Sequence, residues 1–259
     1  MIVESLNREE NTAFPMDRNQ LIKIVFLCLA SLIVISLLLE VIAMIYYPGG
    51  CSVAIAAQDR FDFVWNTLTD LGRDVTQRVG LNNLISQTIY RIAILIMSVF
   101  GIVYHSIIWK YYIKNRINKY LVSAGTFLGI AQAGLYISVL FVLQEWRTHN
   151  KLIAAAAGSL IAAVLLYMIA SFRNKDLPKI IKWTYFAIFT LAVIYAIIVL
   201  TGVLIHNAGV SDVLYYASQR IGHTLFNWIL SLLFIILSVG FFKFEKDKEN
   251  LIEEINKTK

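Results

Sequence analysis

The chain has 259 residues, of which 58% are hydrophobic and 15% are charged, and its mean hydropathy is +0.67. Soluble domains contain about 45–50% apolar and about 25% charged residues, so this composition excludes an ordinary soluble domain. The formal net charge is +6, but the basic residues lie in short segments between apolar stretches. Nucleic acid is therefore excluded as a partner, because binding it requires a contiguous basic surface.

A polar N-terminal tail, residues 1–20, precedes six apolar stretches that are each about long enough to cross a bilayer. Hydrocarbon offers the backbone no hydrogen-bond partners, so each stretch is predicted to be a helix. The stretches are Leu21–Tyr47, Leu84–Tyr111, Tyr120–Val142, Leu152–Phe172, Ile181–Ile205 and Ile221–Phe242. The predicted fold class is all-α, a six-helix bundle of a multi-pass membrane protein spanning residues 21–242, followed by a C-terminal tail, residues 243–259.

The longest connector, residues 48–83, follows the first span and is named the lid segment below. Apolar residues recur in it at helical spacing from Phe61 to Leu71, and Gly72 stands where a helix would end. This pattern predicts an amphipathic helix on the outer membrane face. Two interpretations stay open: the helix covers the bundle, or it gates a pocket.

Small residues recur four positions apart in two neighbouring spans. Such strips let two helix backbones approach closely where no hydrophobic effect drives their association. They predict that the third and fourth spans pack together, with a homodimer through one strip as the alternative. The strips are Gly125, Gly129 and Ala133 in the third span, and Ala154, Gly158 and Ala162 in the fourth.

The connectors alternate between strongly and weakly basic, which predicts the orientation of the chain. Cytoplasmic connectors carry an excess of Lys and Arg. The rich connectors contain Lys110, Lys114, Arg116 and Lys119, and then Arg173, Lys175, Lys179 and Lys182. Both termini are therefore predicted to be cytoplasmic, in a cell membrane.

Ionisable residues within the spans each need a partner, because an isolated charge in hydrocarbon costs several kcal/mol. Glu40 in the first span and Arg91 in the second both lie about seven residues, on the order of 10 Å, from the outer end. We predict an ion pair between them, which Gln87 would complete. The pair serves either as a structural tie or as a proton or substrate site.

The last span carries Arg220, His223 and Asn227 on one face, because they are spaced three and four apart. Three histidines also fall at outer helix ends, close to carboxylates, and are predicted to ring an outward-facing polar pocket. His105, deeper in the second span, is predicted to be a hydrogen-bonded interior histidine. The candidate pocket residues are Glu40, Asn66, Asp70, Arg91, Glu145, His149, His206, Arg220, His223 and Asn227.

No motif in the chain indicates a metal site, a cofactor or a known catalytic arrangement. No two histidines have the H-E-x-x-H or H-x-x-x-H spacing that preorganises metal ligands. A nucleophile elbow, a phosphate-binding loop and a dinucleotide-binding glycine pattern are also missing. The sequence therefore favours a protein that is not an enzyme, and it predicts neither metal nor cofactor.

The lid segment contains the run Asn66-Thr67-Leu68-Thr69-Asp70-Leu71-Gly72-Arg73. It resembles the N-x-L-S-D-L-G signature of the bacterial and archaeal membrane family known as domain of unknown function 998. Further similar positions are Pro48-Gly49-Gly50, Asn82-Asn83, His149, Gln219-Arg220-Ile221 and Trp228. Thr69 departs from the usual serine, and Gln219 stands where an acidic residue is common.

This resemblance covers roughly residues 21 to 242 and implies a six-helix bundle. The family is distantly similar to the damage-regulated autophagy modulator class, which implies a lipid-related role in the membrane. It implies no established reaction.

Three functions follow from the sequence as alternatives. The first is non-catalytic binding of a lipid or a protein partner through the outward-facing pocket, with membrane lipids, a second copy or another membrane protein as partners. The second is a small-solute or proton-coupled transporter, which needs polar side chains continuing toward the cytoplasmic half, where the sequence indicates little beyond His105. The third is a lipid-modifying enzyme, which needs two or three titratable groups within hydrogen-bond reach.

Overall fold

The computed structural model describes residues 18–50, 60–62, 66–76, 80–112, 116–142, 145–207 and 212–257. The side chains at 18, 19, 146, 203, 205–207, 212–219, 252, 253 and 257 lie outside this description. The described chain is helical, with α2 (Arg18–Ile45), η1 (Leu68–Gly72), α3 (Leu84–Ile108), η2 (Trp109–Tyr111), α4 (Arg116–Val139), α5 (Trp146–Arg173), α6 (Lys179–Asn207) and α7 (Asp212–Lys257).

Six of these helices, α2 to α7, are long and apolar enough to cross a membrane, which confirms the six predicted apolar helices. Only 22–39% of the residues in their most apolar stretches are buried inside the protein. The remaining apolar side chains, such as Leu38, Phe127 and Leu200, are exposed on the outside of the bundle. This surface suits hydrocarbon rather than water.

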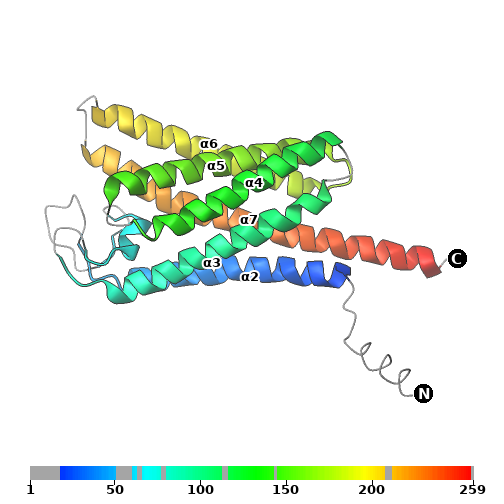
Figure 1. Ribbon diagram of the computed structural model, residues 1–259, viewed down its shortest axis with the longest axis horizontal. Coiled ribbons are helices and arrows are strands. Elements are labelled where there is room, and N and C mark those ends of the chain that lie inside the picture. The colour runs from blue at the N-terminus through cyan, green and yellow to red at the C-terminus, as the bar shows by residue number, and fades with distance from the viewer. Residues whose placement is uncertain are drawn as a thin grey trace, which may run out of the picture.

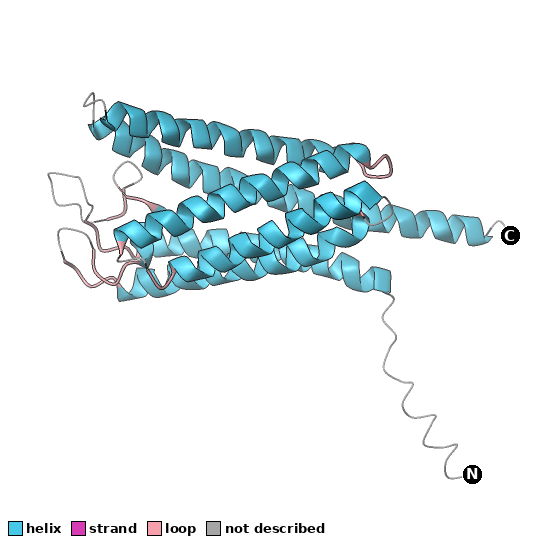
Figure 2. Ribbon diagram, turned by 45° about the horizontal axis from the view of Figure 1, so that its top comes forward, coloured by secondary structure: helices cyan, strands magenta, loops and turns pink. Residues whose placement is uncertain are grey.

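The six long helices form an elongated bundle (Figures 1 and 2), and the contacts between them close into a ring. Each long helix packs against the helices before and after it in the chain, and α7 packs against α2 to close the ring. The beginning of α2 and the end of α7 therefore lie at the same end of the bundle, where α7 extends beyond the other helices (Figure 1). The 46 residues of α7 span about 70 Å, more than twice the hydrocarbon thickness.

Aromatic side chains fill much of the centre of this ring. Tyr104, Tyr167 and Tyr185 are fully buried there, and the rings of Phe100 and Phe234 meet edge to face with centroids 5.5 Å apart. Such edge-to-face pairs are favourable beyond the area that they bury.

Glycines in α4 let these large side chains approach the helix backbone. A Cβ atom on Gly125 would lie 3.2 Å from the Tyr167 ring and 3.3 Å from the carbonyl oxygen of Ala163, both on α5. A Cβ atom on Gly129 would overlap the ring of His105 on α3. The strip in α4 therefore packs against two neighbours, α3 and α5.

The predicted packing of the third and fourth spans is confirmed, since α4 packs against α5. The strip predicted on the fourth span is not the contact surface, however. Ala154 and Gly158 are exposed, and no atom of another helix lies within 4 Å of a Cβ placed on Gly158. The buried residues of α5 instead include Ala156, Ala163 and Tyr167.

The lid segment is less helical than predicted. Phe61, Asp62, Asn66 and Thr67 are not helical, and only the single 3-10 turn η1 follows them; residues 63–65 lie outside the description. The Asn66 side chain accepts a hydrogen bond from the backbone N–H of Asp62 over 3.0 Å. Such local side-chain bonds compete with helix formation, which explains the short turn. The turn does end at Gly72, as predicted.

We predict that Gly129→Ala destabilises the protein by about 1–3 kcal/mol, because its methyl group must displace the His105 ring in a packed core. Thermal unfolding of the purified protein in detergent measures the change. Gly158→Ala is the matched control, and it should leave the melting temperature unchanged or slightly raised, since Ala favours helix. Equal losses for both variants would contradict the packing of Gly129 against His105.

Candidate functional site

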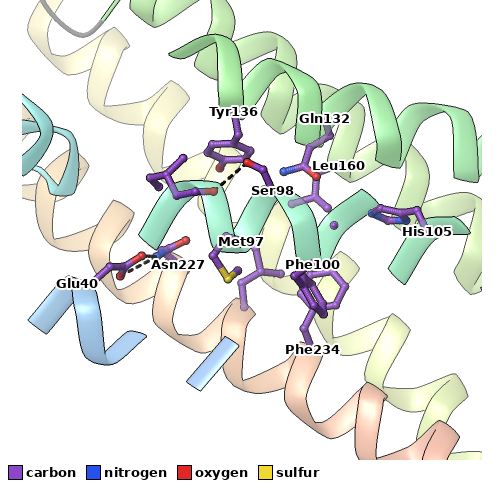
Figure 3. Close-up of a pocket in the computed structure, with 13 residues that line it drawn as sticks. Glu40, Met97, Ser98, Phe100, His105, Gln132, Tyr136, Leu160, Asn227 and Phe234 are labelled. Atoms are coloured by element: carbon purple, nitrogen blue, oxygen red, sulfur yellow. Dashed lines mark hydrogen bonds between the residues drawn. The ribbon is translucent and has the colours of Figure 1, made fainter. Parts of the chain in front are cut away.

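A central cavity of about 60 Å³ lies inside the ring (Figure 3). Residues of α2, α3, α4, α5 and α7 line it, and both polar and apolar side chains contribute. The lining residues are Glu40, Ile94, Met97, Ser98, Phe100, Gly101, His105, Gln132, Tyr136, Leu160, Asn227, Leu230 and Phe234. Glu40 and Asn227 lie at one end of the cavity and His105 at the other (Figure 3).

Glu40 is 1% exposed, and its carboxyl group is held by neutral donors from α7. The side-chain N–H of Asn227 lies 3.2 Å from each carboxyl oxygen, and the indole N–H of Trp228 donates to Oε2 over 3.2 Å. Among the ion pairs of the described residues, none includes Glu40. The carboxyl group is therefore oriented by α7 without a countercharge.

The predicted Glu40–Arg91 ion pair is wrong. Arg91 pairs with Asp74 of the lid segment over 2.9 Å, and Gln87 donates to the same carboxylate. Gln87 and Arg91 are four residues apart and therefore lie on one face of α3. This face points toward Asp74 of the lid segment. Sequence spacing predicts how deep each charge lies along its helix, but not the direction in which that helix face points.

His105 is buried at the other end of the cavity and is hydrogen-bonded, as predicted. Its Nδ1 lies 3.0 Å from the hydroxyl of Tyr167 on α5, and the two rings stack with centroids 5.6 Å apart. Thr126 on α4 lies 3.2 Å from both the Tyr167 hydroxyl and the carbonyl oxygen of His105. Three helices therefore meet in one polar cluster.

Further polar contacts continue from His105 toward the end of the bundle where α2 begins. The hydroxyls of Tyr104 and Tyr185 are 2.6 Å apart, and those of Tyr112 and Ser171 are also 2.6 Å apart. The prediction that this half offers little polar chemistry beyond His105 is therefore wrong. The prediction considered only charged and amide side chains and left out the tyrosines. A buried tyrosine hydroxyl usually needs a hydrogen-bond partner.

The other end of the bundle is covered by the lid segment, which is tied down through asparagines. Asn83 donates from its side chain to the carbonyl oxygens of Leu71 at 2.9 Å and Arg73 at 3.0 Å. Asn66 donates to the carbonyl oxygen of Gly50 over 2.7 Å. Gly50 has a φ of 90°, which glycine adopts without the strain that a side chain would cause.

Asp70, another candidate pocket residue, also serves the lid segment. Its carboxylate accepts a hydrogen bond from the N–H of Thr67 over 2.8 Å and lies 3.2 Å from Nε of Arg73. Leu68 and Leu71, on the same turn, are almost fully buried against Tyr47 and neighbouring apolar residues. Asn66 and Asp70 therefore shape the lid segment and do not line the central cavity.

A second cavity of about 20 Å³ lies between the lid segment and the central cavity. The two cavities share Ile94, Tyr136 and Asn227 as lining residues. Leu68 and Thr69 of the lid segment line the second cavity, and so does His223. The second cavity therefore separates the lid segment from the Glu40 end of the central cavity.

The predicted outward-facing ring is only partly assembled. His149 is buried and lies close enough to Asp70, Arg73 and His223 to interact with them electrostatically. Glu145 is exposed at the beginning of α5. The other ring candidates are Arg220, which is buried, and His206, whose side chain lies outside the described residues. Within the described part of the chain, no three His, Cys, Asp or Glu residues come together as a set of metal ligands.

No family model, curated protein or solved structure matches the chain. The resemblance to domain of unknown function 998 therefore stays a prediction. The candidate site is a polar cavity with the carboxyl group of Glu40 at one end and the imidazole of His105 at the other.

We predict that Asn83→Ala loosens the lid segment, because it removes the donor for two buried carbonyl oxygens at a cost of about 1–3 kcal/mol. Hydrogen–deuterium exchange followed by mass spectrometry should show faster exchange in residues 66–76 and unchanged exchange in α5 and α6. Asn150→Ala, at an exposed position on α5, is the control and should leave the lid segment unchanged. Unaltered exchange in Asn83→Ala would contradict this role of Asn83.

Proposed function

We propose that the protein binds a small, positively charged solute in the central cavity, with Glu40 as the group that recognises the charge. The observation that supports this proposal is the burial of Glu40 beside the cavity, where its donors among the described residues are the neutral side chains of Asn227 and Trp228. A charge within a membrane span is costly unless it is paired, and such residues commonly mark substrate or ion paths. A cationic solute would supply the missing countercharge.

The volume of the cavity sets the size of the solute. One water molecule needs about 10–15 Å³ of such space, so 60 Å³ has room for about four waters or a solute of a few heavy atoms. A lipid would need a larger space than this cavity provides. The proposal keeps non-catalytic binding through a polar pocket, and it moves the pocket from the outer surface to the centre of the bundle.

Aromatic rings next to the cavity also favour a cation. Phe100, Tyr136 and Phe234 line the cavity, and the faces of aromatic rings attract positive charge. Gln132 adds an amide group that accepts hydrogen bonds. A small ammonium ion can interact favourably with all of these groups. Its positive charge suits the aromatic rings, and its N–H groups can donate hydrogen bonds to Gln132.

A proton-coupled transporter is the second candidate, because polar contacts continue past the cavity. The His105–Tyr167–Thr126 cluster and the Tyr104–Tyr185 pair extend from the cavity toward the end of the bundle where α2 begins. Relays of protonatable side chains, such as carboxylates and histidines, carry protons in membrane pumps and transporters. In that case Glu40 and His105 would exchange protons through water in the cavity.

Glu40→Gln should weaken the binding of methylammonium at least tenfold, a loss of about 1.4 kcal/mol, because it removes the recognising charge but keeps the size of the side chain. Trp228 provides the readout, since its indole N–H contacts Glu40. Titration of the full-length protein in detergent should change tryptophan fluorescence in a saturable way, and Trp228→Phe should remove this change.

Glu145→Gln is the matched control, because it removes the same charge at an exposed position. Equal methylammonium affinity in Glu40→Gln and the unmodified chain would contradict the proposal. An assay with proteoliposomes that contain a pH-sensitive dye distinguishes the second candidate, proton transport, from solute binding. Proton influx that needs Glu40 and Tyr167 but no methylammonium would favour proton transport over solute binding.

We also propose that both termini are cytoplasmic, because the two strongly basic connectors lie at the end of the bundle where α2 begins. The test uses single-cysteine variants, Arg147→Cys and Lys175→Cys, in a chain with Cys28 and Cys51 replaced by serine. A membrane-impermeant maleimide should label position 147 in intact cells and position 175 only after permeabilisation. Labelling of position 175 in intact cells would contradict this orientation.

A further inference from the structure

A groove of about 360 Å³ lies between α2 and α7, at the end of the bundle where α2 begins. It is separate from the central cavity, and no residue lines both. The residues that line the groove are Gln20, Lys23, Ile24, Leu27, Phe242, Lys246, Glu249 and Asn250.

The groove changes from polar to apolar along its length. On α2 the order into the bundle is Gln20 and Lys23, followed by Ile24 and Leu27, which are both 46% exposed. On α7, which runs in the opposite direction, Asn250, Glu249 and Lys246 precede Phe242. Both helices thus place their polar side chains at the bundle end and their apolar side chains toward its middle. This gradient matches a molecule with a polar head and an apolar tail.

The charges in the groove favour an anionic head. Lys23 and Glu249 contact each other as an ion pair across the groove. Lys246 is exposed and makes no ion pair with the described residues. One positive charge is therefore left over at the polar end, where the headgroup of a membrane lipid would lie.

We propose that this groove binds one molecule of an anionic glycerophospholipid. The phosphate contacts Lys246, with Lys23 and the amides of Gln20 and Asn250 near the rest of the headgroup. An acyl chain covers Ile24, Leu27 and Phe242. The bound lipid links the beginning of α2 to α7 at the point where α7 leaves the bundle, and it therefore supports the Lys23–Glu249 contact between the two helices.

The first test measures lipid binding by native mass spectrometry of the full-length protein in detergent, titrated with phosphatidylglycerol. Lys246→Gln should weaken the one-lipid complex about fivefold, the effect of one basic residue near an anionic headgroup. Lys243→Gln is the control, because Lys243 is an exposed lysine on α7 that does not line the groove. Equal losses in both variants would overturn the proposal, since they would indicate general surface charge.

A second variant tests the apolar half of the groove. Leu27→Trp fills the space for the acyl chain and should also reduce the one-lipid complex, whereas Val34→Trp, at an exposed position outside the groove, should not. Inorganic phosphate that competes at the same concentration as the lipid would overturn the proposal, because the tail would then contribute nothing. A change in dimer formation by Lys246→Gln, without a change in lipid binding, would identify the groove as a protein interface and also overturn it.

Discussion

The fold depends on one constraint: the outer surface of the helix ring is apolar, so polar side chains within the spans must find partners inside it. The hydrogen bonds that result connect helices beyond the neighbours in the ring. Tyr104 joins α3 to α6, and His105 joins α3 to α5, although the backbones of these helix pairs do not pack together. Glu40 joins α2 to α7 where the ring closes. These contacts fix how each helix is rotated about its own axis.

Small residues make this arrangement possible. At two places a facing backbone without a side chain makes room for a large polar side chain, at Gly129 beside His105 and at Gly125 beside Tyr167. The central cavity is the space inside the ring that these side chains do not fill. The cavity is therefore lined by the same polar groups that hold the helices together, with Glu40 at one end and His105 at the other.

The lid segment explains why the candidate site lies deeper than the sequence indicated. Asn66, Asp70 and Asn83 use their polar atoms to hold backbone and side-chain groups within the lid segment. Groups committed in this way have less capacity to bind a ligand. The motif that carries the family resemblance thus builds a cover, and the chemistry that the cover encloses comes from α2, α3, α4 and α7.

The sequence by itself determined the six apolar helices, the position of Gly72 at the end of a turn and the buried environment of His105. These features follow from local chemistry, because hydrocarbon requires helices and a buried imidazole needs a partner. Only the tertiary structure decided which partners meet, since Arg91 turned to Asp74 while Glu40 turned to Asn227 and Trp228. Sequence spacing gives the depth of a residue along its helix, whereas the direction that it faces depends on the packing of all six helices at once.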